Sequence, residues 1–298
     1  MRTPQLSAGL TLAATPIGNL ADASHRLVAA LGQADVIAAE DTRRVRQLAA
    51  GLGVTLSGRI IAFHDHNEEA RADELLDLAA AGQAVLVVSD AGMPTISDPG
   101  FRLAARAHER DLPLTVLPGP SAVVTALALS GIATDSFCFD GFLPRKGRRR
   151  AAALTRLAAE PRTSIIFESP HRLAATLAEL AAACGPEREA AIARELTKIH
   201  EEVRRGSLIE LEQWARQGVR GEIVIVIAPC SSAPGVGDPG ITSPGPLGDE
   251  PAEPDPRFVA EVRRLAELGL RMKIAARHVA TREGINAREL FNLAVADS

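Results

Sequence analysis

The hydrophobic positions of this chain gather in short, continuously apolar runs over roughly its first three quarters, with helical patterns between them. Runs that are apolar on every position are expected of strands covered on both faces, and strands that alternate with helices are typical of α/β layering. The runs predict strands at 10–14, 36–39, 60–63, 84–89, 114–117, 137–141, 163–167, 190–194 and 222–228.

Two helix boundaries stand out among the polar positions. Asn67 followed by two glutamates predicts the start of a helix over 67–77, because an Asn cap and acidic side chains suit the positive end of a helix dipole. Ser169 followed by Pro170 predicts the start of another helix, and Gly185 predicts its end.

The pattern stops after residue 229 and resumes near residue 257. The stretch between is rich in Ser, Pro, Gly and acidic residues without periodicity, which is typical of a linker. Beyond it, apolar positions 258, 262, 265 and 268 fall on one helical face, and 272–282 and 287–296 predict two more helices, an arrangement open to a helix-turn-helix. The predicted organisation is an α/β lobe, a second α/β lobe, a linker and a helical extension, at 1–118, 119–229, 230–256 and 257–298.

The length and composition of the chain limit the classes of protein to which it can belong. The 298 residues are too many for one small core, and 46% hydrophobic against 23% charged residues favours a well-buried soluble protein. No apolar run reaches the roughly 20 residues of a membrane helix, and residues 1–9 lack a signal-peptide pattern, so we expect a cytoplasmic protein without a membrane partner. Three scattered cysteines predict neither a disulfide framework nor a metal site.

Four predicted strands are followed by loops of small, turn-forming residues, at 15–19, 89–100, 117–122 and 167–172. Glycine and proline after a strand are ordinary turn residues, and each loop alone is explained that way. Four such loops at strand ends favour a shared ligand cleft, because ligands of open α/β sheets bind at the carboxyl ends of the strands. The chain has no dinucleotide fingerprint, Walker loop or nucleophile elbow, which removes support from NAD, ATP and serine-hydrolase chemistry.

The loops share their residues with one family. The motifs are TPIGN at 15–19, AAEDTR at 38–43, HDHNE at 64–68, SDAGMP at 89–94, SDPG at 97–100, PGPSA at 118–122, GFLP at 141–144, ESPHR at 168–172 and RELTK at 194–198. In this order they closely resemble the bacterial 16S ribosomal RNA (cytidine-2′-O)-methyltransferases, which are part of the tetrapyrrole methylase superfamily. The resemblance spans about residues 10–228.

The resemblance implies a two-lobed fold whose cleft holds S-adenosylmethionine, an acceptor in 16S rRNA or the 30S subunit, and a homodimer. It also implies which positions contact the cofactor: Pro16, Asp90, Ala91, Gly92, Ile96, Ser121, Ala122, Phe167 and Leu196. Asn19 stands where many tetrapyrrole enzymes carry aspartate in a loop that serves their substrate, and this departure favours the RNA branch.

Ribose methylation requires the attacking 2′ oxygen to lose its proton. Lys198 is a candidate base if burial lowers its pKa toward neutrality, with Glu195 or Glu168 orienting it. The other interpretations of Lys198, a phosphate contact or a surface ion pair, stay open.

Candidate RNA contacts lie in two further segments. Residues 145–150 form the densest basic cluster, which could bind phosphates or simply begin a solvated helix. Histidines 64 and 66 could face the substrate or hydrogen-bond within their loop. His171 and Arg172 of the ESPHR motif are added to these candidates. The candidate substrate residues are then Asn19, His64, His66, Arg145, Lys146, Arg148, Arg149, His171 and Arg172.

Two other functions compete with rRNA methylation. A methylase of cobalamin precursors would have the same fold, although the basic cluster and the helical extension argue against it. A non-catalytic ribosome assembly factor would bind S-adenosylmethionine only structurally, or not at all.

Overall fold

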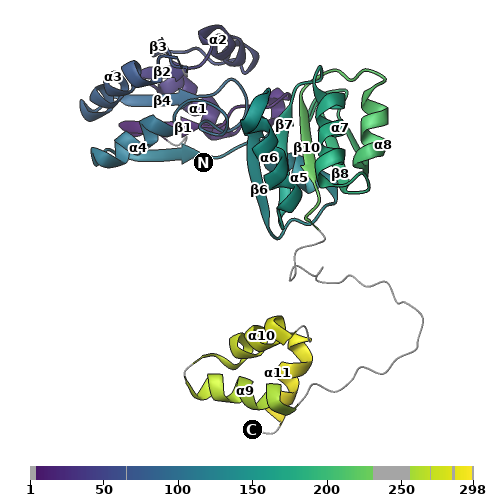
Figure 1. The fold of residues 1–298 in the computed structure, drawn as a ribbon. Coiled ribbons are helices and arrows are strands. Elements are labelled where there is room, and N and C mark those ends of the chain that lie inside the picture. The colour runs from purple at the N-terminus through teal and green to yellow at the C-terminus, as the bar shows by residue number, and fades with distance from the viewer. Residues whose placement is uncertain (1–4, 65, 231–255, 269, 284–285, 297–298) are drawn as a thin grey trace. The chain divides into compact units, whose positions relative to one another are not determined.

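The computed structural model describes residues 5–64, 66–230, 256–268, 270–283 and 286–296. The chain divides into two compact units, Met1–Ser231 and Ser232–Ser298, and each is described by itself. The first unit holds two five-stranded sheets, each flanked by helices (Figure 1). The expected boundary at residue 118 falls between these sheets, and the expected linker at 230–256 lies almost entirely outside the described residues.

The first sheet is parallel and has the order β3-β2-β4-β1-β5. Its strands are β1 (Gly9–Ala13), β2 (Val36–Ala39), β3 (Arg59–Ala62), β4 (Ala84–Val88) and β5 (Leu114–Leu117). Its helical segments are η1 (Leu20–Asp22), α1 (His25–Gln33), α2 (Thr42–Gly51), α3 (Glu68–Ala80) and α4 (Phe101–Glu109).

Both faces of this sheet are covered, which explains why its strands are apolar at nearly every position. On one face Leu75 of α3 and Leu103 of α4 pack against side chains such as Val85. On the other face Leu31 of α1 and Val45 of α2 pack against side chains such as Leu86, the residue that follows Val85 in β4.

The second sheet is mixed, with the order β6-β7-β10-β8-β9. Only β6 and β7 run parallel, and the other neighbouring strands are antiparallel. The strands are β6 (Phe137–Phe142), β7 (Thr163–Glu168), β8 (Glu189–Arg194), β9 (Glu202–Ser207) and β10 (Ile223–Ile227). The helices are α5 (Ala122–Ser130), α6 (Gly147–Ala159), α7 (Leu173–Cys184) and α8 (Leu208–Ala215).

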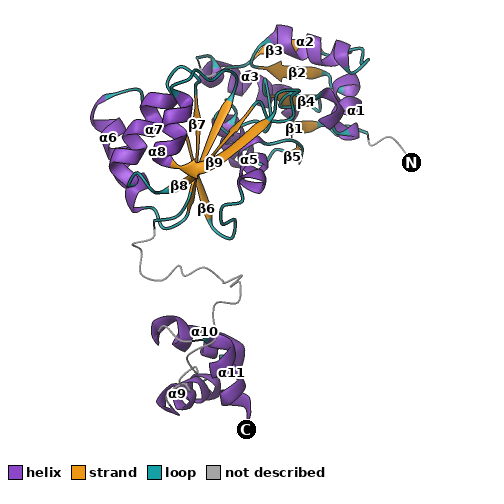
Figure 2. Cartoon of the chain, turned by 90° about the vertical axis from the view of Figure 1, so that its right-hand side faces the viewer, coloured by secondary structure: helices purple, strands orange, loops and turns teal. Residues whose placement is uncertain are grey.

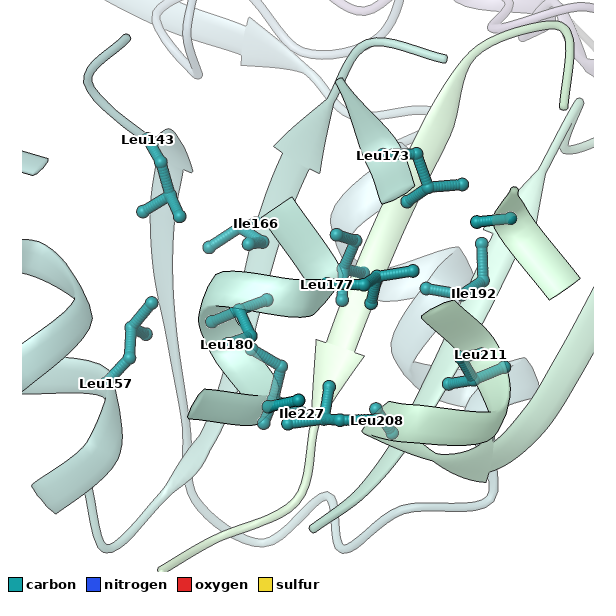
Figure 3. Packing of buried hydrophobic residues seen from close by; sticks show 14 of the residues in the cluster. Leu143, Leu157, Ile166, Leu173, Leu177, Leu180, Ile192, Leu208, Leu211 and Ile227 are labelled. Carbon is teal, nitrogen blue, oxygen red and sulfur yellow. The ribbon is translucent and has the colours of Figure 1, made fainter. Parts of the chain in front are cut away.

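Alternate residues of these strands supply two cores. Figure 3 shows Ile166, Ile192 and Ile227 packed beneath leucines of α6, α7 and α8. Val224 and Ile165 point to the opposite face, which α5 covers (Figure 2). Burial on both faces again explains the apolar strands, and it fixes their register because a one-residue slip would exchange the two cores.

Two helix starts differ from expectation. Ser169 was expected to cap the helix that follows it, but α7 begins at Leu173, with Arg172 in the capping position, because residues 170–172 form a separate turn closed by an Arg172 N–H to Ser169 carbonyl bond of 3.1 Å. Asn67 does precede α3, yet its side-chain oxygen accepts from the His64 N–H at 2.8 Å, so it stabilises the preceding loop.

The second unit contains α9 (Pro256–Glu267), α10 (Met272–Glu283) and α11 (Ala287–Ala296), close to the predicted helices. Val262, Val279 and Leu290 form its small core. Leu268, expected on the apolar face of α9, is 70% exposed because the helix ends one residue before it. Among the described residues, no helix combines the length and apolar character needed to cross a membrane.

Candidate active site

A cavity of about 430 Å³ opens where loops of both sheets meet. The loop after β4, the start of α5, the end of β7 and the start of β10 all contribute lining residues. Eight of the nine positions implied as cofactor contacts line it together: Asp90, Ala91, Gly92, Ile96, Ser121, Ala122, Phe167 and Leu196. Segments far apart in the sequence therefore converge on one site, and this volume is in the usual range for small-molecule sites.

The ninth position, Pro16, lies in the wall of a second cavity of about 490 Å³. Asp90 lines both cavities. Between them the loops after β1 and β4 are tied together by a short antiparallel bridge, in which Thr15 and Gly92 exchange backbone hydrogen bonds of 2.9 and 3.1 Å. This bridge fixes the loops relative to each other.

The loop after β4 holds a strained backbone. Gly92 has φ of 79°, which glycine adopts readily, but Thr95 and Ser97 also have positive φ, at 74° and 65°. The carboxylate of buried Glu68 holds the far end of the loop, where it accepts from the N–H groups of Gly100 and Arg102 at 3.0 and 3.1 Å. The strain is therefore fixed by contacts outside the loop, as is typical of preorganised binding sites.

The cavity suits a ligand that is mostly apolar with a few polar groups. Side chains of Ile17, Ile96, Phe142 and Phe167 give it apolar walls. A Cβ at position 92 would come within 3.3 Å of Ile17, so glycine there leaves the backbone open to a ligand. The carboxylates and hydroxyls of the lining are the polar partners that a nucleoside and an amino-acid group need: Asp90, Asp98, Ser121, Glu168, Ser169 and Glu222. These residues fit S-adenosylmethionine.

Lys198 lies at the rim of this site in an ion-pair cluster. Its Nζ donates to Glu195 Oε1 at 2.8 Å and to Glu222 Oε2 at 3.1 Å. Partial burial lowers the pKa of Lys198, but the hydrogen bonds to Glu195 and Glu222 outweigh it, so that its pKa lies above the ordinary value. The condition under which Lys198 would be a base, a pKa lowered by burial, is therefore not met here, and of the interpretations left open the structure shows the ion pair.

Glu195 is held firmly in the same cluster. Its Oε1 also accepts from the Glu222 N–H at 3.0 Å, and the hydrogen bonds from Lys198 and from that N–H lower the pKa of its carboxyl. Glu195 and Thr197 both have positive φ, and they flank Leu196, which lines the cavity. The cluster fixes the backbone that presents Leu196.

Glu168, the other expected partner of Lys198, is bound elsewhere. Its carboxylate is buried at the end of β7, where it accepts from the Thr176 hydroxyl at 2.6 Å and pairs with Arg172 at 3.4 Å. Arg150 donates to the same Thr176 hydroxyl at 2.9 Å and to the Pro144 carbonyl at 3.0 Å.

The basic segment therefore divides into two parts. Arg150, counted with the cluster from sequence, is only 7% exposed and forms an ion pair with Glu179, so it is a structural residue. The remaining basic side chains are exposed around the start of α6: Arg145, Lys146, Arg148 and Arg149. They follow Phe142, a lining residue, closely in the chain.

The other expected substrate residues line neither cavity. Asn19 is exposed, and its side-chain oxygen caps η1 by accepting from the Ala21 N–H at 3.0 Å. The rings of His64 and His66 are arranged edge to face, with 6.1 Å between their centroids. His64 Nε2 lies 3.2 Å from the amide nitrogen of Asn67. His171 is exposed in the turn before α7.

Sequence reasoning missed one wall of the first cavity, the segment from Gly221 to Val224. The strand at this place is predicted, but its antiparallel direction is not. Only that direction brings the beginning of β10, rather than its end, beside the ends of β7 and β8.

Comparisons with known proteins agree with this geometry. The sequence model of the family described as Tetrapyrrole (Corrin/Porphyrin) Methylases matches residues 9–212. A Mycobacterium tuberculosis protein named Ribosomal RNA small subunit methyltransferase I is 48% identical over 96% of this chain and 94% of its own length. A Synechocystis protein of the same name is 41% identical over 96% of this chain and 97% of its own length.

Solved structures share the fold. Uroporphyrin-III C-methyltransferase from Thermus thermophilus, solved in complex with S-adenyl homocysteine, has a TM-score of 0.52 and 18% identity over 73% of this chain and 95% of its own. A family match over two thirds of the chain, nearly full-length relatives and a shared fold lead to one conclusion: the chain belongs to the tetrapyrrole methylase family.

Proposed function

We propose that this protein transfers a methyl group from S-adenosylmethionine to the 2′-hydroxyl of a cytidine in the decoding region of 16S rRNA. The observation that carries the proposal is the 48% identity, over nearly the whole chain, to a protein named as a small-subunit rRNA methyltransferase. Support also comes from the cavity, because most of the loops that resemble the cytidine-2′-O family contribute residues to its lining.

When bound, S-adenosylmethionine supplies a methyl group on a positively charged sulfur. The task of the chain is to hold this group, exclude water and orient the acceptor, and such positioning can contribute several kcal/mol to lowering the barrier. Ile96, Phe142 and Phe167 are the walls that exclude water, while Asp90 and Ser121 bind polar groups.

The attacking hydroxyl must give up a proton. Lys198 is an ammonium in its cluster and has no lone pair to accept it, so its role is to hold Glu195 and the backbone of Leu196. The groups that can take the proton are the carboxylates of the lining, which include Asp90 and Glu168.

The exposed basic side chains at the start of α6 are proposed to bind rRNA phosphates. We also propose that the protein is cytoplasmic and that it is a homodimer. Light scattering of the purified full chain tests the dimer by measuring its mass in solution. A monomer at the concentrations used for catalysis would contradict the dimer.

The decisive test is transfer of tritium from labelled S-adenosylmethionine into small ribosomal subunits from a strain that lacks this protein. We expect label that remains in alkali-resistant dinucleotides, because a 2′-O-methyl group blocks cleavage of the next phosphodiester bond. Subunits from the parent strain are the control, since their acceptor is already methylated. Base-linked label would contradict ribose chemistry.

Two further measurements separate the competing functions. Calorimetric titration with S-adenosylmethionine should show binding, whereas a non-catalytic assembly factor need not bind it. Uroporphyrinogen offered as the acceptor should receive no label, whereas a tetrapyrrole methylase would transfer it.

A further inference from the structure

Of the nine positions implied as cofactor contacts, two, Pro16 and Asp90, line the second cavity of about 490 Å³, so most of its lining is left without a function. It opens beside the ends of β1, β2 and β4 and is walled on one side by α2. A methyltransferase needs two sites within reach of each other, one for the donor and one for the acceptor. Asp90 lines both cavities, so the two lie next to each other.

We propose that this second cavity binds the acceptor nucleotide, unstacked from its RNA neighbours; the proposal rests on the RNA methyltransferase function proposed above. Enzymes that modify a base within structured nucleic acid extrude the nucleotide into a pocket, and we extend this arrangement to the modification of a ribose. A volume of about 490 Å³ lies within the usual range for such ligands.

The lining has the chemistry of a nucleotide site. Leu20 and Leu48 offer apolar faces for a base, and Gln47 presents an amide with both a donor and an acceptor for a base edge. Gln47 is exposed, so its amide is accessible.

Arg44 contributes a positively charged side chain to the lining of this cavity. Its Nε lies 3.3 Å from Asp90 Oδ2, and its side chain is 60% exposed, so the rest of the guanidinium can meet a phosphate or a base. The next arginine on α2, Arg46, instead donates to the Thr42 carbonyl at 3.1 Å and does not line the cavity. Arg46 is therefore a matched control on the same helix.

The segment around Asp90, which borders both cavities, is held by hydrogen bonds. Asp90 Oδ1 accepts from the Asp41 N–H at 3.0 Å, and the Ser89 hydroxyl donates to the Gly92 carbonyl at 3.0 Å. Together with the bridge between the loops after β1 and β4, these bonds fix Asp90 between donor and acceptor. A nucleotide in the second cavity would thus lie next to a carboxylate that also borders the cofactor site.

The test compares four variants of the full chain: Arg44→Met, Gln47→Trp, and the controls Arg46→Met and Arg46→Trp. Arg44→Met removes the cation, and Gln47→Trp fills the cavity without changing charge. Methyl transfer to unmethylated small subunits and calorimetric binding of S-adenosylmethionine are measured for each.

We expect Arg44→Met and Gln47→Trp to raise the KM for subunits, or lower kcat/KM, by about tenfold or more, which corresponds to the loss of one charge-assisted contact. Cofactor binding should change little in Gln47→Trp; Arg44→Met also removes the partner of Asp90, so it should weaken cofactor binding, but by less than it weakens kcat/KM for subunits. The Arg46 controls should behave as wild type. Equal activity of all four variants and the wild type would overturn the acceptor site. If the wild type itself labels no RNA, the proposed function fails instead, so the two failures are distinguishable.

Discussion

At the scale of single residues, the sequence identifies the polar groups of the site better than their protonation or partners. Lys198 was a candidate base oriented by Glu195 or Glu168, with an ion pair as one alternative, and the structure places it in ion pairs with Glu195 and Glu222 that raise its pKa. Residue spacing cannot show this, because the partner carboxylate of Glu222 comes from the segment just before β10, 24 residues along the chain. A lysine held by two carboxylates has a raised pKa, whatever its burial favours.

This pairing leads to a prediction about Lys198→Arg. The hydrogen bonds between the two groups raise the pKa of Lys198 above its ordinary value and lower the pKa of Glu195 below its own, so the pair stays ionised throughout the neutral range. Its contribution to stability is lost only as the pH rises through the first pKa or falls through the second. Because arginine keeps the cation, Lys198→Arg should retain methyl transfer within a few-fold and leave its pH profile unshifted.

Lys198→Met is the contrasting variant. It leaves two carboxylates without their cation, so cofactor binding should weaken by roughly fivefold to tenfold, about 1 kcal/mol for a partly exposed pair. Rates over pH 6 to 9 and calorimetric titration of both variants check the idea. A loss of about 100-fold or more in the rate of methyl transfer by Lys198→Arg would indicate that Lys198 acts as the base.

Arg150 gives a second residue-scale prediction. It binds Glu179, Thr176 and the Pro144 carbonyl from a buried position, so Arg150→Met leaves several polar groups with fewer partners. We expect the free energy of unfolding to fall by about 2 to 3 kcal/mol. The neighbouring Arg149→Met should change it by less than about 0.5 kcal/mol, because Arg149 is exposed. Urea unfolding of both variants measures the difference, and equal midpoints would contradict the buried role.

At the scale of elements, most of the apolar strands could be predicted from the sequence because they are buried at nearly every position, as β2, β4 and β10 are. The strand at Val36–Ala39 matches its prediction in full. The strand at Glu202–Ser207 was missed, because it is an edge strand whose sequence, EVRRGS, carries hardly any apolar residues. Among the described residues it pairs with β8 and no other strand, so its position depends on pairing rather than on burial.

The cofactor cavity could be predicted in the same partial way. Loops after parallel strands gather at one edge, so a shared site near Asp90 follows from the α/β pattern. The wall near Gly221 did not follow, because strand direction in a mixed sheet depends on contacts distant in sequence. The family motifs covered the loops but gave no signal for this segment.

Glu68 carries the element-scale prediction. Its buried carboxylate caps α4 from α3 and anchors the strained loop that lines the cavity. Glu68→Ala should reduce the free energy of unfolding by about 1 to 2 kcal/mol, as loss of a helix cap does. It should also weaken S-adenosylmethionine binding, since the loop loses its anchor. Glu69→Ala is the control because Glu69 is exposed; thermal melts and titrations that fail to separate the two variants would remove the anchoring role.

At the scale of the whole molecule, the distribution of charge decides where RNA can be attracted. The net charge is −4, so the chain as a whole does not attract RNA, and any phosphate contact depends on a local cluster. The exposed part of the basic segment is such a cluster, and it lies close in the chain to a wall of the cofactor cavity. RNA bound there would be held near the site where the methyl group is transferred.

This arrangement predicts a change in salt dependence. In Arg148→Ala/Arg149→Ala, RNA affinity should fall, and the slope of log affinity against log salt should become shallower by about 1.4, close to 0.7 for each lost phosphate contact on single-stranded RNA. Arg156→Ala is the control on the same helix, because Arg156 pairs with Asp140 at 2.7 Å. Filter binding of 16S rRNA across a salt series measures the slopes. Because counterion release depends on phosphate contacts and not on cofactor binding, an unchanged slope in the double variant would exclude this segment from the RNA interface even if its activity fell.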